Sequence, residues 1–532
     1  MRTTVVLAAS LLSTAALAQP VVAEAPLRAH LSFLADDLLE GRGTGQRGGD
    51  LAVRYLETQA AVAGLQPLQD GTYRQALTIV GSKALPSSTV TFSAGGKTLS
   101  PAFGKDIVFG AANGQQTVAF DAPVVFAGYG IRAPEENWDD FKGIDLKGKL
   151  VIMMVNDPQP TAAEPNRFAG KSLTYYGRWV YKYEEALRQG AAGVLLIHTT
   201  ESASYPWSVP ANGFGHERFS LAGAGNAMEG WLQEDAARAL FQQAGQDLDA
   251  LRAQAETRDF RPVALDATIK VALNSQVRSI EQFNVAGIVP GTDPQLKDEA
   301  VIYSGHWDHL GKQGKDDEKA GDTIYNGAVD NASGTAGLLA MAQEAVKKPA
   351  KRTQIFLWVA AEEQGLLGSA AYAADPLWPL NKTAAALNLD SLNFVGATHD
   401  GAQGSERTEL GAMAAATAQA MGMHIAAARP DLAGGYFRSD HFSFAKAGVP
   451  AFSINGGREY IKDVAASKAK AAAYGPRYHQ VTDEYDASWD LSGMTQQAQF
   501  TLNLGQAVAN AAKMPAWKAG DAFGKAREQA AK

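Results

Sequence analysis

The stretch "TQIFLWVAAEEQGLLGSAAYAA" at residues 353–374 shows how this part of the chain is built. Its opening residues are mostly apolar or β-branched and predict a strand that is buried on both faces, as in a parallel sheet. The following "GLLGSAAYAA" predicts a helix. Two adjacent carboxylates, Glu362 and Glu363, stand where the strand ends. Burying either charge is costly unless something compensates it, so this pair calls for an explanation.

The same alternation of strand, loop and helix continues from about residue 278 to residue 512 and predicts an α/β domain. Strands are expected within "EAVIYSGHWDHLG" (299–311) and "TAAALNLDSLN" (383–393), and helices within "NASGTAGLLAMAQEAVKK" (331–348) and "MTQQAQFTLNLGQAVANAA" (494–512). Because the strands are continuous apolar runs, we expect a mixed, largely parallel central sheet flanked by helices.

The remaining segments predict further divisions of the chain. Residues 85–277 contain short β-rich runs, such as "APVVFAGYGI" and "GKLVIMMVND", and predict a separate, inserted domain. Residues 24–84 show two helical patterns and are expected to form the N-terminal part of the α/β domain. Between these helices, "EGRGTGQRGG" (40–49) follows no strand and lacks the pattern of a phosphate-binding loop, so we interpret it as a plain loop. Residues 513–532 predict a loose polar tail.

The N-terminus is typical of a secretory signal peptide. "MRTTVVLAASLLSTAALA" has one early arginine, an apolar stretch and small residues before a cleavage site, which predicts a signal peptide over residues 1–18. The apolar stretch is too short for a good membrane span, so no span is expected. The alternative is an uncleaved N-terminal helix. The chain contains no cysteine and therefore no disulfide, and we expect a secreted or periplasmic bacterial protein.

Composition limits the size of the domains and the kinds of partner. The 532 residues are too many for one ordinary core, so two or three domains are expected. The net charge is −8 and no stripe of lysine or arginine stands out, which argues against nucleic acid as a partner. The sequence does not indicate an oligomeric state.

The residues that carry chemistry fall at one predicted edge of the sheet. In an open α/β sheet, ligands bind beyond the carboxyl ends of the strands. This edge receives His306, Asp308, Asp330, Glu362, Glu363 and Asp390, and the downstream loop "RYHQVTDEY" supplies Tyr478, His479 and Asp483. Each residue alone has an ordinary structural explanation, such as a helix cap for Asp330 or a turn for Asp390. Their occurrence together at one edge predicts a functional site.

Two histidines and several carboxylates suit zinc. One zinc ion could not use all of these ligands and still leave a position open for water, so we expect two zinc ions. His306 and Asp390 are expected to bind one ion. Glu363 and His479 would bind the other, and Asp330 would bridge the pair. Two such ions can share a bridging water, lower its pKa and polarise a substrate carbonyl.

This arrangement explains why two glutamates stand side by side. Neighbouring residues of an extended chain point in opposite directions, so Glu363 can turn to the metal while Glu362 stays unligated. Glu362 is then predicted to act as the general base that takes a proton from the bridging water. Asp308 is the expected hydrogen-bonding partner of the His306 imidazole. Tyr478 is predicted to donate a hydrogen bond to the developing oxyanion.

The motifs "SGHWDHLG", "GAVDNASGTAGLLAMA", "AAEEQGLLGS", "NLDSLN", "SDHFSFAKAGVPAF" and "YHQVTDEYD" resemble those of the M28 family of zinc peptidases. The resemblance covers most of residues 278–512, and "LLEGRGTGQRGG" is similar to that family's N-terminal segment. Residues 85–277 resemble a protease-associated (PA) domain through "FAGYGI", "LKGKLVIMM" and "ALRQGAAGVLLIHTT". The resemblance implies a zinc-exopeptidase fold with a PA-like insertion. It also implies a co-catalytic di-zinc site on the ligands named above, with Glu362 as the base and Tyr478 beside the oxyanion.

The resemblance further implies peptide substrates and, most often, the removal of N-terminal residues. Family relatives also include carboxypeptidases, single-zinc glutaminyl cyclases and binding proteins that have lost metal ligands. No expected ligand is lost here, which argues against a single-zinc cyclase and against a binding protein, and the family's usual activity favours an aminopeptidase. Arg438 is a candidate substrate contact, with a surface salt bridge as its alternative. We interpret His441 as structural, and we expect His309 on an exposed loop.

Overall fold

The computed structural model describes residues 21–69, 71–223, 225–313, 321–401 and 406–530. The predicted signal peptide lies outside the described residues. None of the helices in the described ranges has the length and apolar character needed to cross a membrane.

The predicted α/β region is built on four parallel strands. In sheet order these are β21 (Ala451–Ser453), β18 (Thr383–Asn388), β14 (Ala300–His306) and β17 (Thr353–Val359), and the antiparallel β13 (Val263–Val289) pairs with β17. Every residue of β14, β17 and β18 is buried, as continuous apolar strands require when both faces are covered. The prediction of a mixed, largely parallel central sheet is therefore confirmed.

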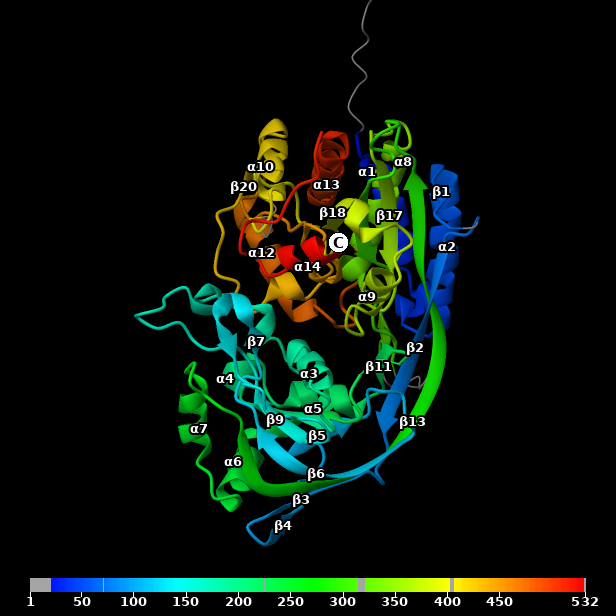
Figure 1. Cartoon of the computed structure of the whole chain (residues 1–532). Coiled ribbons are helices and arrows are strands. Elements are labelled where there is room, and N and C mark those ends of the chain that lie inside the picture. Colours follow the sequence, from blue (N-terminus) through cyan, green and yellow to red (C-terminus); the bar gives the residue numbers. More distant parts are fainter. Residues whose placement is uncertain (1–20, 70, 224, 314–320, 402–405, 531–532) are drawn as a thin grey trace, which may run out of the picture.

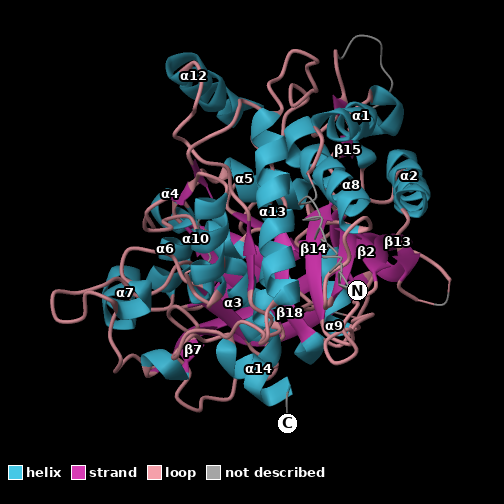
Figure 2. Ribbon diagram, turned by 90° about the horizontal axis from the view of Figure 1, so that it is seen from above, coloured by secondary structure: helices cyan, strands magenta, loops and turns pink. Residues whose placement is uncertain are grey.

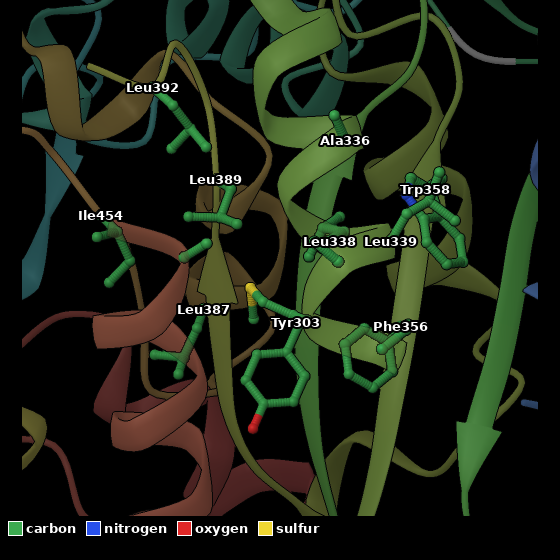
Figure 3. Packing of buried hydrophobic residues seen from close by; sticks show 14 of the residues in the cluster. Tyr303, Ala336, Leu338, Leu339, Phe356, Trp358, Leu387, Leu389, Leu392 and Ile454 are labelled. Carbon is green, nitrogen blue, oxygen red and sulfur yellow. The ribbon is translucent and has the colours of Figure 1, made fainter. Parts of the chain in front are cut away.

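Helices cover both faces of this sheet. On one face lie α1 (Glu24–Leu34), α2 (Arg47–Ala63), α8 (Gly334–Ala345) and α13 (Ser492–Asn510) (Figure 2). On the other face lie α9 (Leu367–Ala374) and α11 (His441–Lys446). Side chains alternate between the two cores, because successive strand residues point to opposite faces. Tyr303 and Phe356 pack with Leu338 of α8 on the first face (Figure 3), whereas Ile302 and Ile355 belong to the second core.

The middle of the chain forms a second layered region. Its parallel strands are β6 (Thr117–Phe126), β9 (Leu150–Met154), β10 (Gly193–His198) and β12 (Glu229–Gln233), with β5 (Ile107–Gly110) antiparallel to β12. Helices α3 (Trp179–Arg188), α5 (Ser208–Gly215), α6 (Glu234–Gln243) and α7 (Leu248–Ala255) accompany these strands. The expected β-rich segment thus contains substantial helix as well.

One long strand joins the two regions. Strand β13 is 27 residues long and pairs with β6 near its start, with β2 (Arg74–Ala84) along its middle and with β17 at its end. Figure 1 shows it curving from the middle region up to the α/β region. The domain boundary expected at residue 277 falls inside this strand.

The remaining strands and helices complete the described chain. They are β1 (Gln66–Pro67), β3 (Thr89–Ala94), β4 (Lys97–Leu99), β7 (Arg132–Ala133), β8 (Trp138–Asp139), β11 (Arg218–Leu221), β15 (Gly311–Lys312), β16 (Ile324–Tyr325), β19 (Asp400–Gly401), β20 (His424–Ile425), α4 (Thr200–Ala203), α10 (Leu410–Ala420), α12 (Val464–Tyr474) and α14 (Gly524–Ala530).

The expectation of a loose C-terminal tail is wrong for the part of the tail that the structure describes. Trp517 donates a hydrogen bond from its indole to the carbonyl of Gly448 (2.8 Å), and Phe523 is buried. Arg527 donates to the carbonyl of Thr383 at 2.9 Å. One tryptophan and one phenylalanine supply the apolar area that holds this otherwise polar segment against the α/β region.

Candidate metal centre

The carboxyl ends of the parallel strands bring the predicted site residues to one edge. His306 is the last residue of β14, Glu362 and Glu363 follow the end of β17, and Asp390 follows β18. Because β14 pairs in parallel with both β17 and β18, these strand ends lie side by side.

Two histidines face each other across Asp330. The Nε2 of His306 lies 3.2 Å from Asp330 Oδ1 and 3.5 Å from Asp390 Oδ1. The Nε2 of His479 lies 3.2 Å from Asp330 Oδ2 and 3.1 Å from Glu363 Oε2. The structure therefore brings together all five expected ligands. Each carboxylate oxygen of Asp330 lies next to a different histidine.

An irregular turn aims Asp330 at this position. Residues Ala328–Ser333 form one π-helical turn, and α8 begins directly after it at Gly334, with Ser333 at the N-cap position. Asp483 holds the turn, because its carboxylate accepts hydrogen bonds from the backbone N–H groups of Val329 and Asp330, each at 3.2 Å. The downstream loop thus supplies both the His479 side chain and the carboxylate that holds the turn at Asp330.

The electrostatics of the cluster favour bound positive charge. Burial works to lower the pKa of His306, but the charge of Glu362 and the contact with Asp330 raise it well above its ordinary value. Burial also works to lower the pKa of His479, whereas its contacts with Asp330 and Glu363 raise it to about 10. The buried Nε2 atom of His306 has no hydrogen-bond partner within the described chain. Imidazole nitrogens among carboxylate oxygens form a donor set that fits zinc.

The two adjacent glutamates have different surroundings. Glu363 accepts a hydrogen bond from Nδ1 of His309 at 2.6 Å. Burial works to raise the pKa of Glu363, but its histidine partners lower it to about 2. Burial raises the pKa of Glu362 well above its ordinary value, and the charges of Glu363 and Asp390 raise it further. Only Glu362 of this pair lines the neighbouring cavity.

The structure corrects one expectation and refines another. His309 was expected on an exposed loop, but it is fully buried and bonded to Glu363, because the 40–49 segment covers it. His306 bonds through Nδ1 to the backbone carbonyl of Asp308 (3.1 Å), while the Asp308 carboxylate oxygen is 3.8 Å away. That carboxylate instead accepts a hydrogen bond from the backbone N–H of Glu362 at 3.0 Å. Asp308 therefore contacts both a ligand and the predicted base.

A cavity of about 1070 Å³ beside the cluster is lined by Tyr478 and Arg438, the two remaining predicted site residues. Tyr478 is 42 % exposed and stacks on His479 with ring centroids 3.9 Å apart. Arg438 is exposed and forms no ion pair with any described residue, so its salt-bridge alternative is not observed. His441 is buried and packs edge-on against Tyr436, with ring centroids 4.8 Å apart.

Arg42 contributes to the site and was missed in the sequence, where its segment looked like a plain loop. This arginine is buried, and its guanidinium donates to the carbonyls of Trp307 (2.8 Å), Asn326 (2.7 Å) and Gly327 (3.1 Å). It ties the loop after β14 to the segment before Asp330. An arginine among glycines would have been the only sequence signal for this role.

Residues 284–503 match the model of peptidase family M28. No curated protein matches the chain. Among solved structures, the chain is similar to an aminopeptidase from Aneurinibacillus sp. strain AM-1, with 18% identity, 93% of this chain and 95% of that chain covered, and a TM-score of 0.51. A zinc aminopeptidase from Bacillus subtilis aligns at 18% identity over 92% of this chain and 96% of that one, with a TM-score of 0.43. At 18% identity, the similarity to the Aneurinibacillus aminopeptidase shows a shared fold.

Proposed function

We propose that this chain is a secreted or periplasmic di-zinc metallo-exopeptidase that releases N-terminal residues from peptides, because residues 284–503 match the model of peptidase family M28. The observation that carries the proposal is the position of Asp330, which offers one carboxylate oxygen to each of two histidine-containing groups. The predicted signal peptide at residues 1–18 supports the location.

The ligands divide between two ions. We assign His306 and Asp390 to one zinc ion, Glu363 and His479 to the other, and Asp330 to both, in keeping with the distances among their donor atoms. When bound, the ions supply Lewis-acid chemistry and lower the pKa of a water molecule.

The residues of the chain then move and position the proton. Glu362 lines the cavity and is free of the histidine contacts that hold Glu363, so it takes the proton of the attacking water and delivers it to the leaving amine. Asp308 orients this base through the Glu362 N–H and orients His306 through its own carbonyl. Tyr478, at the cavity wall, donates a hydrogen bond to the oxyanion of the tetrahedral intermediate.

Two features favour an aminopeptidase. Glu362 and Asp390 both line the cavity, where carboxylates can bind the ammonium group of a free N-terminus. The structural relative from Aneurinibacillus is an aminopeptidase. We assign a substrate contact to Arg438 on the same cavity. We further propose that residues 85–277 form a PA-like insertion that shapes the substrate entrance, since Glu135 and Tyr176 line this cavity as well.

A defined peptide mixture tests the activity. Purified protein is incubated with peptides that have free or acetylated N-termini, and the products are identified by mass spectrometry. We expect ladders shortened only from free N-termini, abolished by a chelator and restored by zinc. Shortening from the C-terminus would instead make the chain a carboxypeptidase. Cyclisation of N-terminal glutamine would indicate a glutaminyl cyclase, and bound zinc without any turnover would indicate a binding protein.

A further inference from the structure

The cavity beside the metal centre has walls from both regions of the chain. Glu362, Asp390 and Tyr478 line the part next to the metal cluster. Residues 172–176 of the middle region and residues within 429–439 of the α/β region line another part. A peptide bound at the metal centre therefore extends along a seam between the two regions.

Backbone contacts fix this seam. The N–H of Leu173 donates to the carbonyl of Asp431 at 2.8 Å, and the N–H of Asp431 donates to the Ser172 hydroxyl at 3.0 Å. Gly434 is closely packed, since a Cβ atom there would lie 3.1 Å from the side chains of both Leu173 and Arg178. The seam is therefore a defined surface with a fixed register.

This surface carries positive charge without a partner. Arg429, Arg438 and Arg458 line the cavity, and none of them forms an ion pair or a side-chain hydrogen bond with a described residue. Arg178 stands at the seam, where its Nη1 donates to the carbonyl of Ala433 (3.3 Å) while its buried Nε has no partner among the described residues. Burial and, to a smaller extent, the charge of Arg438 lower the pKa of Arg178 to about 10.

Two of the acidic residues that line the cavity, Asp431 and Asp521, are engaged by other groups. Asp521 pairs with Arg407 at 2.8 Å. Asp431 accepts hydrogen bonds from the N–H groups of Gly435 (2.8 Å) and Tyr436 (3.0 Å). Neither carboxylate lies within ion-pairing distance of the unpartnered arginines. Like charges held together at a cavity wall are unfavourable unless an anion joins them.

Arg438 directly precedes a residue that is hydrogen-bonded to the metal cluster. Ser439, which follows Arg438 directly, donates its hydroxyl to Asp390 Oδ2 at 2.6 Å. Adjacent Cα atoms are about 3.8 Å apart, and two extended residues span at most about 7 Å. A dipeptide whose ammonium group lies at the acidic cluster can therefore present a carboxylate to Arg438.

We propose that Arg438, reinforced by the charge of Arg178, binds a substrate carboxylate on the leaving-group side of the scissile bond. This inference rests on the proposed peptidase function. It makes the preferred substrates short peptides, either dipeptides with a free C-terminal carboxylate or peptides with an acidic residue after the scissile bond. Guanidinium groups suit this task, because their planar donors match both oxygens of a carboxylate.

Three matched substrates distinguish the two sources of the carboxylate: Leu-Gly, Leu-Gly-amide and Leu-Glu-amide. For the zinc-loaded wild-type protein we expect Leu-Gly to be cleaved with a kcat/KM at least tenfold above that of Leu-Gly-amide. Restored activity on Leu-Glu-amide would assign the site to an acidic side chain as well as to the terminus. Equal rates on all three substrates would overturn the proposal but leave the peptidase function standing, whereas no cleavage of any of them would refute both.

Variants connect the preference to the residue. In Arg438→Gln, an exposed position where loss of folding is not expected, the Leu-Gly to Leu-Gly-amide ratio should fall at least tenfold, mainly through KM. Arg178→Gln should lower the ratio by a smaller factor. Arg132→Gln, an exposed arginine of the middle region that does not line the cavity, is the control and should leave the ratio unchanged. An unchanged ratio in Arg438→Gln, or an equal fall in the control, would refute the assignment.

Discussion

Replacing Arg42 with methionine tests whether a buried arginine holds the loops of the proposed metal site together. The substitution keeps a long apolar side chain but removes hydrogen bonds to four backbone carbonyls, those of Leu34 (2.5 Å), Trp307 (2.8 Å), Asn326 (2.7 Å) and Gly327 (3.1 Å). All four contacts are buried, so the freed carbonyls cannot turn to bulk water.

The size of the effect follows from these contacts. A buried acceptor left without its donor costs about 1–3 kcal/mol, and removing one partner of a buried charged group costs about 3–5 kcal/mol in total. Burial lowers the pKa of Arg42 to about 10, so the guanidinium is charged at neutral pH and its loss also removes a positive charge close to Asp308 and Asp330. We expect the free energy of unfolding to fall by about 3–5 kcal/mol and zinc affinity to fall at least tenfold.

Guanidinium-induced unfolding and competition with a zinc-binding dye measure the two quantities. Arg47→Met is the matched control, because Arg47 lies five residues away with a side chain that is 69% exposed and a single ion pair to Glu40. This control should change stability by less than about 1 kcal/mol. A loss of under about 1 kcal/mol in Arg42→Met, with zinc affinity unchanged, would refute the role of this arginine.

Further substitutions test the assigned roles. Glu362→Gln should keep both zinc ions but lose about 10²–10⁴-fold in kcat, whereas Glu363→Ala should lose zinc, as metal analysis and steady-state kinetics will show; full activity in Glu362→Gln would contradict the division between them. Burial lowers the pKa of His30 from 6.5 to about 4, so its contribution to stability is complete above pH 6.5 and disappears as the pH falls toward 4. The free energy of unfolding, measured across this window, should fall by up to about 3 kcal/mol in the wild type but not in His30→Gln. Identical pH profiles of the two proteins would show that the burial of His30 does not cause this fall.

The sequence predicts the parts of the site that depend on strand ends. The apolar run at residues 355–359 forms most of β17, and the parallel pairing of β14 with β17 follows from the alternation of strands and helices. The position of Asp330 between His306 and His479 depends instead on an irregular turn and on a contact with Asp483, 153 residues further along the chain. Local patterns carry no information about such a contact.

The lack of information about distant contacts also explains why His309 and β13 differ from their predictions. His309 looked exposed because its neighbours are polar and glycine-rich, but the 40–49 segment covers it. Strand β13 was divided between two predicted domains because its alternating pattern continues across the change in composition near residue 277. Tertiary packing decides both cases, and a single sequence records it only weakly.

The most direct test of the central claim is a crystal structure of the zinc-loaded protein with anomalous data on both sides of the zinc absorption edge. We predict two zinc peaks about 3.5–4 Å apart, bridged by Asp330, with His306 and His479 on opposite sides. One peak only, or two peaks that do not share Asp330, would contradict the di-zinc assignment.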